Sequence, residues 1–248
     1  MDGNLDVIIE SPGGDINAAY NISSLFQKYG SKNLIFIIPR WAKSAATLIA
    51  CAGEEILMTP VGELGPLDPQ ITQFNPVEER FETFSPLHIN TTLEMIRNEF
   101  ASGNKDLAEG LLKRLQFPLT LGSFVKANEI GEQYLTKLLK ERMEKTGKLV
   151  QDAAKIARCL SREYADHGFC INLVEAKSIG LNATELQEDL LDLAWDLHTT
   201  HRRREELKLK KHKETSAKLI NSLPPEIRDK IKKNVELPKG LEMVENDE

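Results

Sequence analysis

Two short segments near the start of the chain combine residue types that can carry out acyl chemistry. Gly13 and Gly14 follow an apolar stretch, and glycines at such a turn leave backbone N–H groups free of side-chain obstruction. Ser44 opens a run of small residues, where its hydroxyl is accessible and the N–H of Ala45 can join an oxyanion hole. The glycine pair is equally compatible with a plain tight turn, and Ser44 with a helix N-cap.

The elements around these residues predict that they lie side by side. Apolar stretches at residues 5–10, 33–38 and 55–59 have the pattern of buried strands, and residues 16–29 and 44–52 have helical spacing. This alternation indicates a parallel sheet with right-handed crossovers, so the glycine pair and Ser44 share its carboxyl edge. We expect the Ser44 oxygen to lie within about 8 Å of the Gly14 nitrogen, which leaves room for an oxyanion. Gly30 has the position of a left-handed helix cap.

The remainder of the chain is predicted to be mostly helical. Residues 70–86 are polar with few structural signals and suggest an excursion or a flexible flap, whereas residues 122–146 and 149–164 have the pattern of amphipathic helices. Thr184 and Gln187 form a possible capping box for a helix through Trp195. We therefore expect an α/β domain over residues 1–185 and a charged helical extension over residues 186–248, with a disordered acidic end.

The composition narrows the class of function. The 248 residues carry a net charge of −6, which gives no general attraction to nucleic acids, and the Lys- and Arg-rich stretch at 202–213 fits a solvated helix face. Apolar runs are too short for a membrane segment. Three cysteines without metal-ligand spacing predict no disulfide framework and no metal or cofactor. A cytoplasmic protein is the simplest interpretation.

The Ser-Pro-Gly-Gly loop at 11–14, with a serine in a small-residue context thirty positions later, resembles the Clp-type serine proteases and the signal peptide peptidases. The stretches at 64–70 and 167–168 are similar to the serine dehydrogenase proteinase family, a distant branch of the same group. The resemblance covers roughly residues 5–185. It implies a ClpP/crotonase-like spiral of parallel strands and helices, a serine peptidase acting on peptide or protein substrates, and a homo-oligomer.

The same resemblance implies a catalytic triad of Ser44, Asp68 and His167. Asp68 stands where the Clp enzymes have histidine, and Asp166-His167 where they have aspartate. Gly13, Gly14 and the Ala45 N–H would then form the oxyanion hole. His167 suits a general base because its ordinary pKa lies near neutrality, and Asp68 would orient it. Asp166 is the alternative orienting carboxylate.

Several alternatives remain open at this stage. Lys113 or Lys126 could act as the base, as in the Ser-Lys dyad of signal peptide peptidases. A catalytically silent module for assembly or substrate presentation, or a crotonase-like acyl-CoA enzyme, could use the same scaffold. The family fold has a strand and helix before the glycine loop, so we expect the domain to lack that leading unit. Self-association is expected through the apolar face of residues 122–146.

Overall fold

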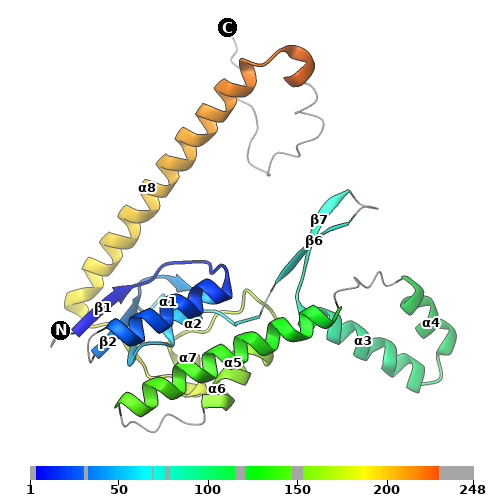
Figure 1. Cartoon of the computed structure of the whole chain (residues 1–248), viewed down its shortest axis with the longest axis horizontal. Coiled ribbons are helices and arrows are strands. Elements are labelled where there is room, and N and C mark those ends of the chain that lie inside the picture. Colours follow the sequence, from blue (N-terminus) through cyan, green and yellow to red (C-terminus); the bar gives the residue numbers. More distant parts are fainter. Residues whose placement is uncertain are drawn as a thin grey trace. The chain divides into compact units, whose positions relative to one another are not determined.

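The computed structural model describes residues 4–30, 33–68, 70–75, 79–114, 121–146 and 153–228. Four short strands make up its main sheet, which is parallel throughout and has the order β1-β2-β4-β8 (Figure 1). These strands are β1 (Asn4–Ile8), β2 (Asn33–Ile38), β4 (Glu55–Met58) and β8 (Ala183–Glu185). The predicted α/β fold with a parallel sheet is confirmed, and it is consistent with a ClpP-like domain.

Two helices alternate with the first strands, as the apolar spacing predicts. Helix α1 (Ile16–Tyr29) connects β1 to β2, and helix α2 (Ala45–Ala50) precedes β4. The core between helices and sheet consists of apolar side chains such as Leu34, Phe36 and Leu48, all fully buried. Phe26 of α1 meets the Phe36 ring edge-on at a centroid distance of 5.7 Å.

Gly30 ends α1, but the prediction of a left-handed cap is wrong. Its φ of −66° and ψ of 164° are extended, and its N–H donates to the Phe26 carbonyl. A side-chain carbon at this position would lie only 2.3 Å from the Phe26 oxygen. Glycine is therefore required here by close approach of the backbone and not by its φ angle.

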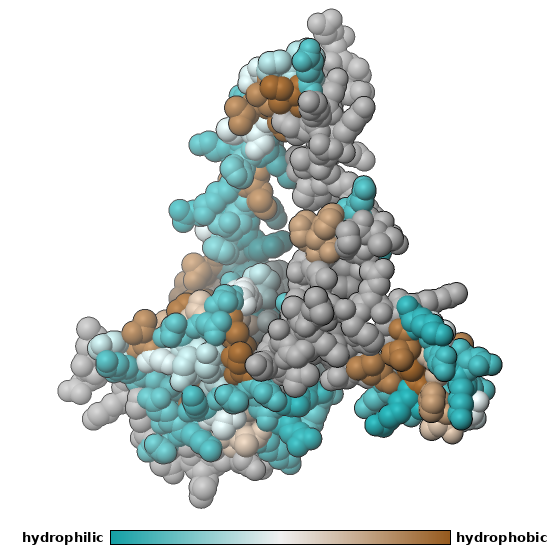
Figure 2. Space-filling model, turned by 45° about the vertical axis from the view of Figure 1, so that its right-hand side comes forward, coloured by the Kyte–Doolittle hydropathy of each residue, from teal (hydrophilic) through white to brown (hydrophobic). Residues whose placement is uncertain are grey.

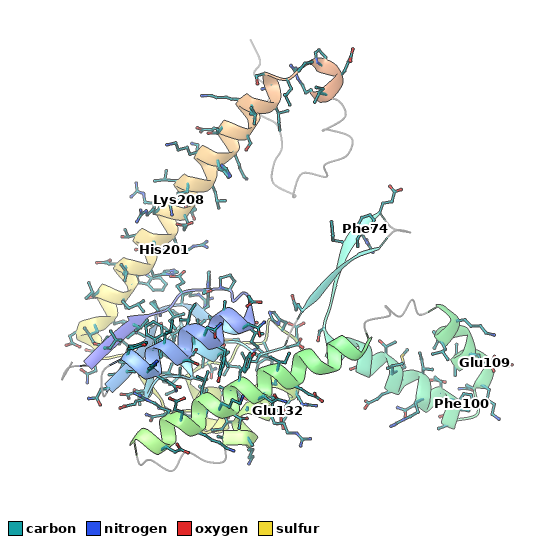
Figure 3. All side chains as sticks on the ribbon, viewed as in Figure 1. Phe74, Phe100, Glu109, Glu132, His201 and Lys208 are labelled. Carbon is teal, nitrogen blue, oxygen red and sulfur yellow. The ribbon has the colours of Figure 1, made fainter. Side chains whose placement is uncertain are left out.

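Two further pairs of strands stand apart from the main sheet. The strands β3 (Trp41–Ala42) and β5 (Glu63–Leu64) are parallel, and β6 (Ile71–Asn75) with β7 (Arg80–Phe84) forms an antiparallel hairpin. The predicted excursion at residues 70–86 therefore contains a two-stranded hairpin, which the sequence did not indicate. Phe74 and Phe81 are cross-strand partners with ring centroids 5.3 Å apart, and Phe74 is labelled on the hairpin in Figure 3. Such aromatic pairs stabilise a two-stranded ribbon.

The middle of the chain is helical, as predicted. Its helices are α3 (Pro86–Ala101), α4 (Lys105–Arg114), α5 (Leu121–Thr146), α6 (Ala153–Arg162) and α7 (Leu173–Ile179). Helix α5 packs against α6 and α1, and Leu135, Leu138 and Leu139 on its inner side are buried in the common core. At these three residues the predicted apolar face therefore packs within the chain's own fold, whereas Ile130 of the same face is 37% exposed.

The predicted capping box at Thr184 is also wrong. Thr184 lies in β8, the fourth strand of the sheet, and its hydroxyl donates to Glu55 Oε1 at 2.6 Å. Helix α8 begins at Glu188 and ends at Asn221, well beyond Trp195. The chain divides into two compact units, residues 1–192 and 193–248, and the division falls within α8. The predicted disordered acidic end lies outside the described residues.

Candidate active site

A ladder of backbone hydrogen bonds brings four distant segments together. Ser11 pairs with Ala42, Ala42 pairs with Leu64, and Leu64 pairs with Ile171. The first two pairings are parallel and the last is antiparallel, with N···O distances of 2.9 and 3.1 Å between Leu64 and Ile171. Because neighbouring strands lie about 4.8 Å apart, the segments that extend from one end of this ladder are close neighbours.

These extensions contain the residues predicted from the sequence. Gly13 and Gly14 follow Ser11, Ser44 follows Ala42, and Asp68 follows Leu64. The strand direction reverses at Ile171, so the residues before it, including His167, run toward the same end. The glycine loop, Ser44, Asp68 and the His167 turn are therefore on segments that leave the ladder at the same end, and Gly13 is in direct contact with Ser44.

The backbone at Ser44 is strained. Ser44 has φ 51° and ψ −121°, a conformation that residues with a side chain adopt rarely and at a cost of about 1–3 kcal/mol. It occupies the N-cap position of α2, yet its side chain makes no capping hydrogen bond. The interpretation of Ser44 as an ordinary N-cap therefore fails, because an N-cap serine accepts a hydrogen bond from the first turn. A sharp, strained strand-to-helix turn is how hydrolases expose a nucleophilic serine.

The glycine loop is packed directly against Ser44. Gly13 has φ +110°, and a side-chain carbon there would lie 2.9 Å from Ser44 Cβ and 3.3 Å from the Ala45 nitrogen. Since a carbon–carbon bond is about 1.5 Å long, the Gly13 Cα lies within about 4.5 Å of Ser44 Cβ. At Gly14, by contrast, an added carbon would meet nothing within 4 Å. The loop is tight on the Ser44 side and open on the other.

Two backbone donors are available at this junction. Within the described part of the chain, neither the Gly14 nor the Ala45 N–H donates a hydrogen bond, whereas the Gly13 N–H donates to Ser11 Oγ at 3.1 Å. Backbone donors without an internal partner beside a serine hydroxyl are what an oxyanion hole requires. The arrangement can hold a developing negative charge next to Ser44.

The predicted base and its orienting carboxylate are on different segments of the ladder. Across the described ranges, no hydrogen bond joins Ser44 to His167, and His167 Nδ1 is buried without a partner. Asp68 is 5% exposed and follows Leu67, whose N–H donates to the Leu160 carbonyl at the end of α6. Asp166 is exposed, and its Oδ1 accepts from the Gly168 N–H at 2.7 Å, which shapes the turn around His167.

The two lysines considered as alternative bases lie on different helices. Lys113 lies on α4, its side chain is 78% exposed, and it pairs with Glu109 at 3.4 Å. A lysine acts as a base when burial removes its charge, so this solvated position does not suit the role. The backbone of Lys126 lies in α5, and its side chain is outside the described residues.

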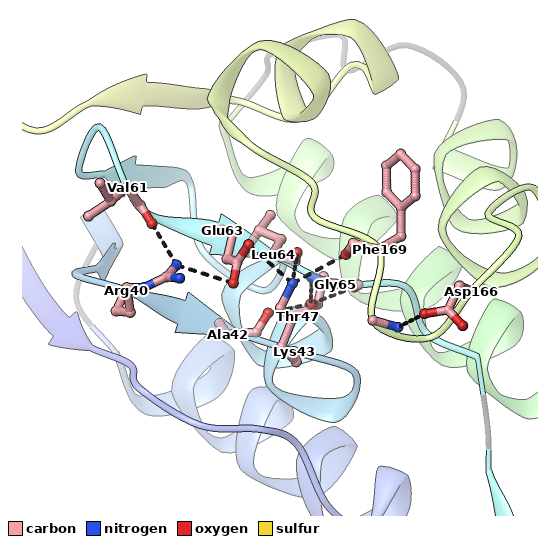
Figure 4. Close-up of polar contacts among 11 residues, drawn as sticks. Arg40, Ala42, Lys43, Thr47, Val61, Glu63, Leu64, Gly65, Asp166 and Phe169 are labelled. Atoms are coloured by element: carbon pink, nitrogen blue, oxygen red, sulfur yellow. Dashed lines mark hydrogen bonds and ion pairs between the residues drawn. The ribbon is translucent and has the colours of Figure 1, made fainter. Parts of the chain in front are cut away.

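The structure shows that further residues, which the sequence did not single out, lie near Ser44 (Figure 4). The Thr47 hydroxyl is fully buried, lies within 2.8 Å of the Ala42 and Gly65 carbonyls, and accepts from the Gly65 N–H. Lys43 reaches the Leu64 and Phe169 carbonyls and pairs with Glu63. Lys43 and Glu63 lie twenty positions apart in the sequence, so no local pattern could reveal their pairing.

Burial and neighbouring charges shift the ionisation of this cluster. Burial opposes the charge of Glu63, but hydrogen bonding from Cys170 together with Lys43 and Arg40 holds the pKa of Glu63 below its ordinary value. Burial and the Glu63 carboxylate raise the pKa of the Cys170 thiol. The cluster therefore contains a carboxylate that is ionised at neutral pH and a thiol that is protonated.

Comparison with known proteins supports the predicted family. Residues 1–83 match the family model of the ClpP-like SDH-type serine proteinases, which confirms the resemblance over the first third of the chain. Two uncharacterized proteins of Methanocaldococcus jannaschii are similar. MJ0137 is 38% identical over 73 residues, which are 29% of this chain and 25% of that protein. MJ1495 is 27% identical over 177 residues, which are 71% of this chain and 51% of that protein.

The matched segments thus cover a quarter and about half of the length of these relatives. The family match ends at residue 83. It therefore includes the glycine loop, Ser44 and Asp68, and it does not reach His167.

Proposed function

From this family match we propose that the protein is a serine peptidase that cleaves peptide bonds through an acyl-enzyme on Ser44. The observation that carries the proposal is the strained, uncapped Ser44 packed against Gly13, with the Gly14 and Ala45 N–H groups lacking internal acceptors. The Ser44 hydroxyl would attack the substrate carbonyl, and the two N–H groups would stabilise the tetrahedral oxyanion.

In this proposal His167 accepts the Ser44 proton and returns it to the leaving amine, with Asp68 as the orienting carboxylate. The position of the His167 turn at the same end of the ladder supports the assignment. Water then attacks the acyl-enzyme and releases the second product. Lys113 is disfavoured as base by its solvated ion pair, and Lys126 remains the other candidate.

A catalytically silent module is the second candidate. It is favoured by one observation, that no hydrogen bond links Ser44 to His167 among the described residues. Because catalytic hydrogen bonds often tighten only when substrate binds, activity measurements must decide between the two.

The test is covalent labelling of the full chain with a fluorophosphonate, followed by peptide mapping and a casein hydrolysis assay. We expect a single adduct on Ser44, and neither adduct nor hydrolysis in Ser44→Ala. The matched control is Ser102→Ala, since Ser102 is exposed and its hydroxyl donates to the Asn98 carbonyl one helical turn away. A wild-type protein that never labels at Ser44 would support the silent module.

The base is tested by substitution. With His167 as base, His167→Ala should lower kcat/KM by about 10⁴-fold. Asp166→Asn should have little effect, because the amide oxygen can still accept from the Gly168 N–H. If Lys126→Ala abolishes labelling while His167→Ala does not, a Ser-Lys dyad is the correct assignment.

A further inference from the structure

Lys43 immediately precedes Ser44 and has an acceptor for each of its donors. Its Nζ donates to the Leu64 carbonyl at 3.1 Å and to the Phe169 carbonyl at 3.2 Å, and lies 3.5 Å from Glu63 Oε2. A protonated lysine has three N–H donors. The side chains of Lys43 and Glu63 are only 17% and 15% exposed, so both groups are largely withdrawn from water.

The surroundings fix the course of the Lys43 side chain. A side-chain carbon at Gly65 would lie 2.6 Å from Lys43 Cδ, so glycine at that position makes room for the lysine stem. Glu63 is held in turn by Arg40 at 3.2 Å, and the Arg40 Nη1 also donates to the Val61 carbonyl. The Lys43 side chain is therefore held between Gly65 and Glu63, and Arg40 fixes the Glu63 carboxylate from the opposite side (Figure 4).

The Phe169 carbonyl belongs to the exposed turn that carries His167. Asp166 organises this turn internally, and Ile171 anchors its end to Leu64. Lys43 supplies a bond from the residue next to Ser44 to the middle of the turn, across 126 positions of sequence. Its backbone is also bonded to the glycine loop, since the Lys43 N–H donates to the Ser11 carbonyl at 3.0 Å.

We propose that Lys43 and Glu63 are positioning residues, which hold the His167 turn in register with Ser44 and the glycine loop. Lys43 connects three segments that must keep their mutual geometry during acyl transfer, and Glu63 fixes the direction of its ammonium. The expected effect of Lys43 on kcat rests on the proposed peptidase function. The expected effect of Lys43 on the order of the His167 turn does not.

The kinetic test is Lys43→Met, which keeps the stem beside Gly65 and removes the three polar contacts. Misplacement of a catalytic group by about 1 Å can cost about 100-fold in rate, so we expect kcat to fall by 10- to 100-fold, with KM changed by less than about threefold. Glu63→Gln should give a smaller loss of kcat. The matched control is Lys208→Met, which removes an exposed ion pair with Glu205 on α8.

Titration of active sites with fluorophosphonate to completion separates positioning from stability. Undiminished Ser44 labelling at a slower rate in Lys43→Met supports the positioning role. A reduced labelled fraction with unchanged kcat per labelled site would overturn it, because Lys43 would then serve only folding.

Amide hydrogen exchange tests the turn independently of activity. Peptides covering residues 164–172 should exchange faster in Lys43→Met than in wild type or Lys208→Met. If this occurs in a protein that never labels at Ser44, the positioning role stands and the peptidase proposal fails. Unchanged exchange and unchanged kcat in Lys43→Met would overturn the positioning role.

Discussion

Gly13 and Gly14 are adjacent but differ in how closely they are packed. Gly13 has a positive φ and contacts Ser44, whereas a side-chain carbon at Gly14 would have no neighbour within 4 Å. We therefore expect Gly13→Ala to lower the free energy of unfolding by about 1–3 kcal/mol, and Gly14→Ala to lower it by less than about 1 kcal/mol. Urea denaturation of the two variants measures the difference. Equal losses would mean that Gly13 is not packed against Ser44 as described.

The free cysteines offer a second test at the residue scale. Burial raises the pKa of Cys51 to about 12, so this thiol should resist iodoacetamide at pH 8 in the folded protein. Cys170 is exposed, but burial of its sulfur and the Glu63 carboxylate raise its pKa. Glu63→Gln removes the negative charge and lowers that pKa, so it should accelerate Cys170 alkylation at pH 8. Mass spectrometry of each site measures both rates, and a slower Cys170 reaction in Glu63→Gln would contradict the assigned contact.

At the scale of elements, Gln27 joins three parts of the core. Its Nε2 donates to the Ala52 carbonyl after α2 and to the Leu138 carbonyl of α5, at 3.1 and 3.0 Å. Gln27→Ala removes two buried hydrogen bonds at once, which should lower the free energy of unfolding by about 2–3 kcal/mol. Exposed Gln133 on α5 is the matched control, and its change to alanine should be nearly neutral in the same urea titration.

The pairing of β8 with the main sheet predicts how shortening the chain affects thermal stability. It pairs with β4, and the Leu186 N–H donates to the Met58 carbonyl at 2.8 Å. A chain ending at residue 192 should therefore fold cooperatively, whereas one ending at residue 181 should lose the fourth strand and unfold at lower temperature. Circular dichroism on heating distinguishes the two. Identical melting of both chains would show that β8 contributes little.

Self-association remains a prediction for the whole molecule, now from different surfaces. The inner face of α5 is buried, but Met95 and Phe100 on α3 and Leu107 and Leu112 on α4 are about half exposed. Figure 2 shows hydrophobic surface in the part of the molecule that α3 and α4 form. We expect Phe100→Glu with Leu107→Glu to reduce the mass measured by light scattering and to leave the fold intact. A monomeric wild-type protein at all concentrations would contradict this expectation.

None of the described helices has an apolar stretch long enough to cross a membrane.

The sequence by itself determined where the first strands and helices lie and which chemically active residues follow those strands. Strands and helices around Gly13 and Ser44 follow from apolar spacing, because burial of one face imposes a local period on the residues. Gly30 shows the limit of such reasoning, since glycine serves positive φ and close backbone approach alike. The strand β8 was missed for a similar reason, because three residues are too few to display a period.

Only the tertiary structure decided which of these segments lie side by side. The pairing of Leu64 with Ile171 and the bond from Lys43 to Phe169 each join residues more than a hundred positions apart. Such contacts depend on how strands are ordered and on their direction, which no local pattern records. The strain at Ser44 likewise arises because the ladder and α2 together fix a backbone that the residue alone would avoid.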